Sequence, residues 1–246
     1  MLTTNLLSWR GKARILLEPF TKPSGGDETV GSFLSRKFGR EAYKYYFGPL
    51  YGGIYASDPQ DMYMRHTLSR ALDNAGISGS VLISVLKKVI RGVETPPACS
   101  FEDGMQTLPR TLYDEHKDEV KLRTPVTRIR DTNSGFVLET TRGEEEVDTV
   151  VITTPADVTA GLLEEIDPES SRKLESINYN PLVYVHLYSE CDLEGFGYQV
   201  QWDEDYNTLG VTWNASMFDR KGVYTCFLGG AKNPGLVDKA EDYLGD

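Results

Sequence analysis

Hydrophobic residues in the N-terminal part of the chain recur at the spacing of helices. The first predicted helix reaches Pro19, and the second is expected over ETVGSFLSRKFG with Asp27 as its cap. The pattern predicts further helices over residues 40–47, over residues 60–74 and over SGSVLISVLKKVIRG. Between them, the adjacent glycines and the Asp-Pro pair of YGGIYASDPQD predict an irregular segment.

After this region the hydrophobic period falls to two residues, which is typical of strands. Three consecutive strands are predicted in KLRTPVTRIRDT, GFVLETTRG and EEVDTVVITTP, and the apolar run VVIT is expected to be buried on both faces. Two helices follow, in ADVTAGLLEEI and PESSRKLESI. The runs LVYVHLYS, GYQVQW, TLGVTW and VYTCFLG then predict an antiparallel sheet of meander type, and a last helix begins at Leu236. This order of elements predicts an α+β fold.

The charge of the chain excludes some classes of partner. Its 246 residues include 37 acidic and 26 basic side chains, which give a net charge of −11. A negative field repels phosphate backbones, so we expect no nucleic-acid partner, and it opposes loose docking on anionic lipid. The acidic composition is explained by solubility of the protein, and adaptation to a salt-rich host is the alternative explanation.

Cysteine usage and hydropathy indicate a cytoplasmic protein. Cys99, Cys191 and Cys226 are widely spaced and form no metal-ligand pattern, which fits a reducing compartment and predicts no metal site. No apolar run approaches the length of a membrane span, and charges interrupt the N-terminus too often for a signal peptide.

Familiar catalytic motifs are absent from the sequence. It holds no GxGxxG or GxxxxGK[ST] phosphate loop, no GxSxG and no HExxH. The three histidines, His66, His116 and His186, stand in separate contexts, and His186 within a strand is expected to be a packed or rim residue. The residues therefore name no general base.

Three stretches resemble one known family, the flavin-dependent protoporphyrinogen and coproporphyrinogen oxidases. The first is FLSRKFGREAYKYYFGPLYGGIYASDPQDMYMR, which carries the family pattern F-x-x-R-R-x-G followed by a G-[IV]-Y-x-x-D-P core. The second is FEDGMQTLPRTL with VKLRTPVTRIRD and VDTVVITTPA, and the third is LEGFGYQV, TLGVTWNASMFDRKG and CFLGGAKNPG. The matching residues of the first stretch are Phe33, Arg36, Gly39, Pro49, Gly53, Ile54, Tyr55, Asp58 and Pro59.

The resemblance implies an FAD enzyme of haem biosynthesis that oxidises a porphyrinogen to the porphyrin with molecular oxygen as acceptor. It divides the chain into a helical, membrane-binding-like region (1–98), part of an FAD-binding domain (99–160) and part of a substrate-binding domain with an antiparallel sheet (161–246). The family begins with a GxGxxG strand-turn-helix and ends with a second flavin-contacting segment, and this sequence has neither. We therefore expect an internal fragment that binds FAD weakly or not at all and is inactive alone.

Four residues are cofactor-binding candidates by this resemblance. Val126 matches a family valine whose backbone meets the adenine of FAD, and Thr154, Pro155 and Ala156 end a strand at which cofactors gather. An ordinary strand residue and a plain strand-to-helix turn are the alternatives.

The substrate-binding candidates are Gly52, Gly53, Gly104, Met105, Tyr198, Val200 and Trp213. Trp213 matches an aromatic residue that faces the tetrapyrrole, and Gly52 and Gly53 would let backbone approach the ring edge. Tyr198 and Val200 are expected to share one strand face, with Gln199 on the other side. Packing roles are the alternative for each.

Other functions remain open on the sequence. Another flavin amine-oxidase or desaturase relative is one alternative, and a non-catalytic chain that binds tetrapyrrole is another. The partners implied by the resemblance are a porphyrinogen, molecular oxygen, at most a peripheral membrane contact and a second copy in a homodimer.

Overall fold

The computed structural model describes residues 4–23, 27–92 and 99–239 of the chain. These residues form two compact units. Unit 1 comprises Met1–Glu94 and Asn180–Asp246, and unit 2 comprises Thr95–Tyr179. The helical region and the last strands, expected to be separate domains, thus belong to one unit.

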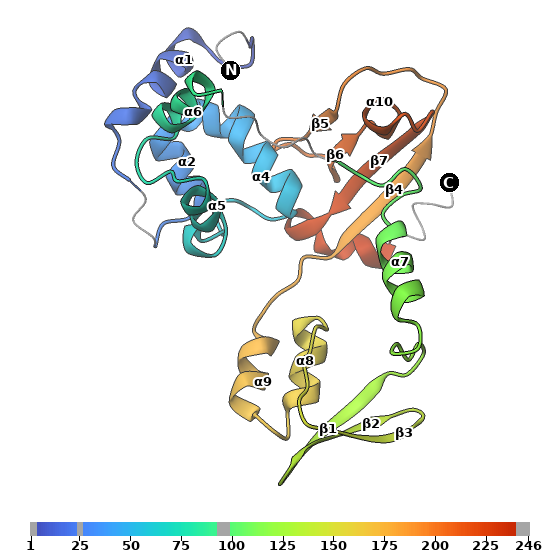
Figure 1. Ribbon diagram of the computed structural model, residues 1–246. Helices are drawn as coiled ribbons and strands as arrows, with labels where there is room; N and C mark the ends of the chain where they lie inside the picture. The colour runs from blue at the N-terminus through green and yellow to red at the C-terminus, as the bar shows by residue number, and fades with distance from the viewer. Residues whose placement is uncertain (1–3, 24–26, 93–98, 240–246) are drawn as a thin grey trace. The chain divides into compact units, whose positions relative to one another are not determined.

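Unit 1 begins with a series of helices, among them those that the hydrophobic period predicts (Figure 1). They are α1 (Trp9–Leu16), η1 (Glu18–Phe20), α2 (Val30–Phe38), α3 (Arg40–Ala42), the π-helical η2 (Tyr43–Phe47), α4 (Gly48–Tyr55), η3 (Met64–His66), α5 (Leu68–Asn74) and α6 (Val81–Ile90). No helix among the described residues is long and apolar enough to cross a membrane.

Three local predictions in this region need correction. The cap of α2 is Thr29, not Asp27, because the Thr29 hydroxyl accepts a hydrogen bond from the Ser32 amide. The paired glycines lie inside α4 rather than in an irregular segment. Helix 60–74 is shorter than predicted: residues 60–63 are not helical, and α5 begins only at Leu68 after η3.

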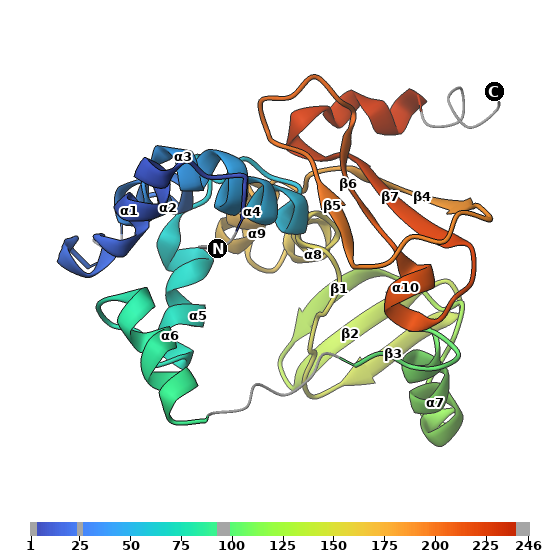
Figure 2. The same cartoon turned by 90° about the horizontal axis from the view of Figure 1, so that it is seen from above.

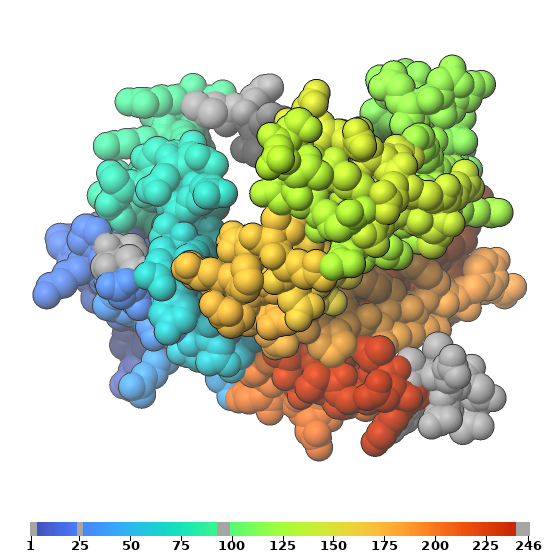
Figure 3. All heavy atoms as spheres, turned by 90° about the horizontal axis from the view of Figure 1, so that it is seen from below, coloured from blue at the N-terminus to red at the C-terminus, as the bar shows by residue number. Residues whose placement is uncertain are grey.

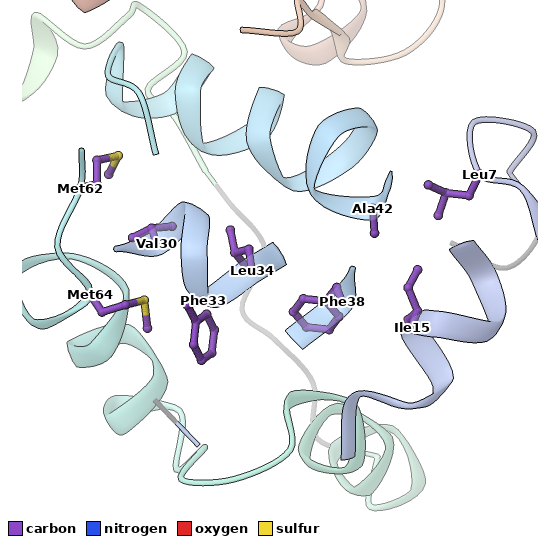
Figure 4. Packing of buried hydrophobic residues seen from close by; sticks show 9 residues of the cluster. All are labelled: Leu7, Ile15, Val30, Phe33, Leu34, Phe38, Ala42, Met62 and Met64. Atoms are coloured by element: carbon purple, nitrogen blue, oxygen red, sulfur yellow. The ribbon is translucent and has the colours of Figure 1, made fainter. Parts of the chain in front are cut away.

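The core of unit 1 lies among these helices (Figure 4). Val30 and Phe33 of α2 lie next to two methionines that follow α4, and Ile15 of α1 lies beside Phe38, so chain segments far apart in sequence share one apolar cluster (Figure 4). The buried members are Leu7, Ile15, Val30, Phe33, Leu34, Phe38, Ala42, Met62 and Met64. Burial of large apolar side chains is the main stabilising contribution to such a cluster.

A buried ion pair lies beside this core. Lys37 on α2 and Glu18 on η1 have side chains that are 1% and 0% exposed, with Nζ and Oε1 2.9 Å apart. The Glu18 carboxylate also accepts hydrogen bonds from the Ser80 hydroxyl and from the Val81 and Leu82 amides at the start of α6. One ion pair therefore joins three helical segments.

The sheet of unit 1 has four antiparallel strands in the order β4-β7-β6-β5. They are β4 (Leu182–Tyr188), β5 (Gly197–Gln199), β6 (Thr208–Thr212) and β7 (Val223–Gly229), with α10 (Asn214–Phe218) between β6 and β7. Segment η5 (Pro234–Lys239) packs on β4 and β7, and Figure 3 shows its red atoms against the orange atoms of the sheet.

The predicted meander is correct for β5, β6 and β7 but wrong for β4. Strand β4 pairs with β7 and not with β5. Although β4 and β5 follow one another in the sequence, they lie at opposite edges of the sheet. The connection between them is held at the end of the sheet, because Tyr224 donates a hydrogen bond to the Cys191 carbonyl and the Gly195 amide donates one to Ser216. These hydrogen bonds depend on tertiary contacts that hydrophobic periodicity does not reveal.

Unit 2 combines a three-stranded antiparallel sheet with three helices. Its elements are α7 (Thr107–His116), β1 (Val126–Thr132), β2 (Gly135–Thr140), β3 (Gly143–Val147), α8 (Ala156–Leu163) and α9 (Pro168–Glu175). Helix α8 packs on α9 and on β1, so the expected boundary at residue 160 falls within this unit.

The apolar run at residues 150–153 is not a strand, and the prediction of a buried strand there is wrong. Val151 in this run is 82% exposed. A strand buried on both faces needs a paired neighbour, and no strand of the described residues pairs with this run.

Candidate functional site

Helix α4 lies against the β5–β6 side of the sheet in unit 1 (Figure 2). Its two adjacent glycines allow this approach. A Cβ at Gly52 would lie 3.0 Å from Cε3 of Trp202, and one at Gly53 would lie 2.9 Å from Nε2 of Gln199. The glycines therefore bring the helix backbone close to the sheet. From the sequence we expected a close approach to the ring of a ligand, whereas in this structure the backbone approaches Trp202 and Gln199.

A row of side chains crosses the sheet face that α4 covers in part. The cross-strand register places Tyr184, Phe227, Gly210 and Gln199 opposite one another. Cross-strand partners share a face, and Gln199 contacts Gly53 of α4. The rings of Tyr184 and Phe227 meet edge to face, with centroids 5.2 Å apart. We call these four positions the aromatic row.

Two hollows adjoin α4 along this sheet. The first has a volume of about 200 Å³ and is lined by Ile54, Leu182 and the aromatic row. The second, of about 570 Å³, is lined by Tyr45 and Leu50 among other apolar residues. Both include Tyr198, Gln199, Val211 and Thr212, so they meet at the β5–β6 pair. Apolar and aromatic walls of this kind suit a flat, largely apolar ligand.

A third hollow, of about 440 Å³, lies beside α3 and the π-helical η2 and is more polar. Tyr43 and Trp202 line it, and Lys44 forms an ion pair with Asp203 at 2.7 Å across one side. The hydrogen bond to Asp203 raises the pKa of Lys44, and burial raises the pKa of Tyr43. Both groups therefore keep their protons at neutral pH.

The other predicted substrate residues of unit 1 have the following positions. Tyr198 lines both apolar hollows, and Val200 directly follows β5. Trp213 lies between β6 and α10, and its ring packs on the Gly195 position, where a Cβ would lie 3.2 Å from Cζ3. Gln199, expected on the side away from the cleft, is the residue that faces α4.

Sequence reasoning missed Tyr184 and Phe227 as lining residues. The signal available was the alternation in LVYVHLYS, which places Tyr184, His186 and Tyr188 on one face. The sequence did not reveal that this face meets α4, because β4 and α4 are brought together only by the fold.

The remaining predicted residues lie in unit 2. Gly104 takes a φ of +90° in the turn before α7, which favours glycine, and Met105 beside it is 66% exposed. Val126 begins β1, an edge strand, and pairs with Thr140.

The segment Thr154-Pro155-Ala156 leads into α8, which begins at Ala156, and its polar groups are engaged within the unit. The Ala156 amide donates to the Tyr179 hydroxyl at 3.1 Å, and the hydroxyls of Thr154 and Thr159 lie 2.8 Å apart. No GxGxxG loop is present in the sequence. The Thr154 hydroxyl and the Ala156 amide are thus engaged by neighbouring groups of the same unit.

Comparison with known proteins gives a consistent relationship. The family model described as flavin containing amine oxidoreductase matches residues 2–242. Protoporphyrinogen oxidase 2 of Arabidopsis thaliana is 28% identical, with 99% of this chain and 58% of the relative covered. Protoporphyrinogen oxidase 1 of Spinacia oleracea is 26% identical (98% and 50% covered), and coproporphyrinogen III oxidase of Bacillus subtilis is 25% identical (98% and 55% covered).

Solved structures agree on the fold. A structure from Exiguobacterium sp. 255-15 matches 99% of this chain and 56% of its own length, with a TM-score of 0.73 at 22% identity. An oxidoreductase from Methanosarcina mazei matches 98% of this chain and 56% of its own, with a TM-score of 0.64 at 12% identity. The chain spans about half the length of the curated relatives it matches.

Proposed function

The chain belongs to the flavin-containing amine oxidoreductase family, and on this premise we propose that it supplies the tetrapyrrole-binding face of a porphyrinogen oxidase. The reaction proposed for the whole enzyme is oxidation of protoporphyrinogen IX or coproporphyrinogen III to the porphyrin, with molecular oxygen as acceptor. The similarity to protoporphyrinogen and coproporphyrinogen oxidases supports this substrate class.

The observation that carries the proposal is the aromatic row beside α4. Tyr184 is 58% exposed and Phe227 supports its ring from the next strand, so a ring face is free to stack on a ligand. The porphyrin product is flat and apolar over its macrocycle, and aromatic side chains bury such a surface well. Because Gly52 and Gly53 have no side chains, the backbone of α4 lies close to the sheet beside this row.

The cofactor proposed for the whole enzyme is FAD. We expect this chain alone to bind FAD weakly, because the polar groups at Thr154 and Ala156 are engaged internally and the phosphate loop is absent from the sequence. The protein's own contribution is therefore to bind and orient the tetrapyrrole, to exclude water from its ring face and to align it for oxidation.

Porphyrin binding tests the proposal directly, since porphyrins are the stable products of the reaction. Protoporphyrin IX is titrated into the chain and followed by its Soret absorbance and by quenching of tryptophan fluorescence. Tyr184→Ala and Phe227→Ala are each expected to weaken binding about tenfold, which corresponds to about 1.4 kcal/mol. Tyr113→Ala on α7 of unit 2 is the matched control and leaves binding unchanged. Equal affinity in all three variants contradicts the proposal.

A flavin titration separates this function from its alternative, a tetrapyrrole-binding chain that does not serve a flavin enzyme. Because this chain alone is expected to be inactive, turnover of porphyrinogen is measured in the whole enzyme at saturating FAD. Porphyrin binding at the aromatic row without turnover by the whole enzyme favours the non-catalytic alternative. The observation that supports this alternative is that the Ala156 amide donates its hydrogen bond to Tyr179 of the same unit.

We further infer a peripheral membrane contact through α6, in a protein that is otherwise cytoplasmic. The helix exposes Leu86, Val89 and Ile90, and Lys87 and Lys88 lie next to them. Exposed apolar side chains with adjacent cations suit the interface of an anionic bilayer. Co-sedimentation with anionic and neutral vesicles tests the contact, and Leu86→Glu is expected to abolish it.

A further inference from the structure

A second row of side chains lies next to the aromatic row on the same sheet face. It runs from His186 through Thr225 and Thr212 to Gly197 in cross-strand register. His186 is two residues from Tyr184 on β4, so the rows are about 6.8 Å apart along the strands. The face thus changes from aromatic to polar within one row, and we call the second set the polar row.

Hydrogen bonds join the polar row into a chain that ends at His186. The Thr212 hydroxyl donates to Oδ1 of Asn214 at 3.1 Å, and Nδ2 of Asn214 donates to the Thr225 hydroxyl at 2.7 Å. Oγ1 of Thr225 lies 3.0 Å from Nδ1 of His186. Thr225 is 5% exposed, whereas His186 is exposed. The buried hydroxyl therefore holds one nitrogen of an open imidazole.

The free nitrogen of this imidazole is Nε2, which makes no hydrogen bond to any residue in the described part of the chain. When the Thr225 hydroxyl donates to Nδ1 of the neutral ring, the ring proton lies on Nε2. A protonated ring donates from Nδ1 to the remaining lone pair of Thr225 and also carries a proton on Nε2. In both forms Nε2 presents an N–H at the end of the aromatic row.

We propose that Nε2 of His186 binds a carboxylate of the ligand whose flat ring stacks on Tyr184 and Phe227. This inference rests on the proposed function, because it assigns the polar end of the same ligand. The carboxylate arms of a porphyrin extend beyond its macrocycle, so an arm reaches a neighbouring row when the ring covers the aromatic one. Thr225 and Asn214 act through His186 as positioning residues. In a chain with a net charge of −11, an anionic arm needs such a local donor.

The experiment compares protoporphyrin IX with its dimethyl ester, which has the same macrocycle and no free carboxylate. His186→Ala is expected to weaken binding of the free acid about tenfold, as for a hydrogen bond to a charged group, and to leave binding of the ester within about twofold. His116→Ala in unit 2 is the matched control for removal of a histidine. Thr225→Val, which keeps side-chain volume, is expected to weaken free-acid binding in the same direction.

A spectroscopic measurement gives a readout that a purely structural role does not move. In ¹⁵N-labelled protein the Nε2 resonance of His186, assigned from the alanine variant, is expected to shift when the free acid is added and to stay in place with the ester. An equal loss of both ligands in His186→Ala, or an unchanged Nε2 resonance with bound free acid, overturns the inference.

The outcomes also separate this inference from the function beneath it. If both ligands bind, Tyr184→Ala weakens both and His186→Ala weakens neither, only the carboxylate contact is refuted. If neither ligand binds the wild-type chain, or Tyr184→Ala has no effect on either, the proposed function and the inference are both refuted.

Discussion

The ion pair of Glu18 and Lys37 makes the stability of unit 1 depend on one fully buried carboxylate. Glu18→Gln keeps the shape of the side chain and removes its charge. Nζ of Lys37 then retains the Gly79 carbonyl at 3.0 Å as its hydrogen-bond partner, with no anion beside it. Removing one partner of a buried pair destabilises a protein by about 3–5 kcal/mol, because the other charge stays buried without compensation. That is a large part of the total stability of an ordinary domain, about 5–15 kcal/mol.

The reverse change, Lys37→Met, is expected to cost about 3 kcal/mol, at the lower end of this range. The Glu18 carboxylate keeps the Ser80 hydroxyl and the Val81 and Leu82 amides, and the N-terminus of α6 is favourable for an anion. The double variant leaves no unpaired charge, so it should be more stable than the sum of the single changes by about 2–3 kcal/mol.

Urea unfolding followed by tryptophan fluorescence measures these changes in the correct unit. Trp9, Trp202 and Trp213 are the three tryptophans of the chain, and all belong to unit 1. A loss below about 1 kcal/mol in Glu18→Gln, or strict additivity of the two single changes, refutes the reasoning.

The same carboxylate has a predictable effect in acid. Burial acts to raise the pKa of Glu18, but the hydrogen bonds from Ser80, Lys37 and the α6 amides outweigh it and lower the pKa below 4.5. A carboxyl whose pKa is lower in the folded state stabilises the protein above its unfolded pKa. This contribution is lost as the pH falls from about 4.5 through the folded pKa, so Glu18→Gln should flatten the acid limb of the stability curve.

Two further predictions test the packing of α4 and the cap of α2. Gly52→Val drives a side chain into the ring of Trp202 and is expected to lower the free energy of unfolding by about 1–3 kcal/mol. Gly53→Ala meets only the flexible end of Gln199, so its loss of stability should be smaller. Urea midpoints and the tryptophan emission maximum of the two variants test this ranking. Thr29→Ala removes the hydroxyl that caps α2 and should lower the free energy of unfolding by about 1 kcal/mol. Asp27→Ala, at the cap expected from the sequence, should leave the stability nearly unchanged. The opposite ranking of the two variants in thermal unfolding contradicts the assignment of the cap.

Much of the local structure followed from the sequence because it depends on short-range patterns. Hydrophobic period located α6, β1 and α8, and it distinguished the helical part from the strands. The GIYASDP and FEDGM segments identified the family without any structural information. Such motifs are read from a few consecutive residues, so no knowledge of distant contacts is needed.

The arrangement of the candidate site was decided by the tertiary structure. Alternation in LVYVHLYS puts Tyr184 and His186 on one face, but only the pairing of β4 with β7 sets Phe227 and Thr225 beside them. Placement of Gln199 toward α4 depends on where the helix docks, which its own sequence does not specify.

The apolar run at residues 150–153 also shows that local sequence does not determine strand pairing. Its composition favours a buried strand, yet strand formation requires a neighbouring strand as well as β propensity. Hydrophobic period and motifs thus determined the elements and the family of this protein. The sheet order, the rows on its face and the partner of Lys37 depended on long-range packing, because hydrogen-bond partners and buried neighbours are chosen only when distant segments meet.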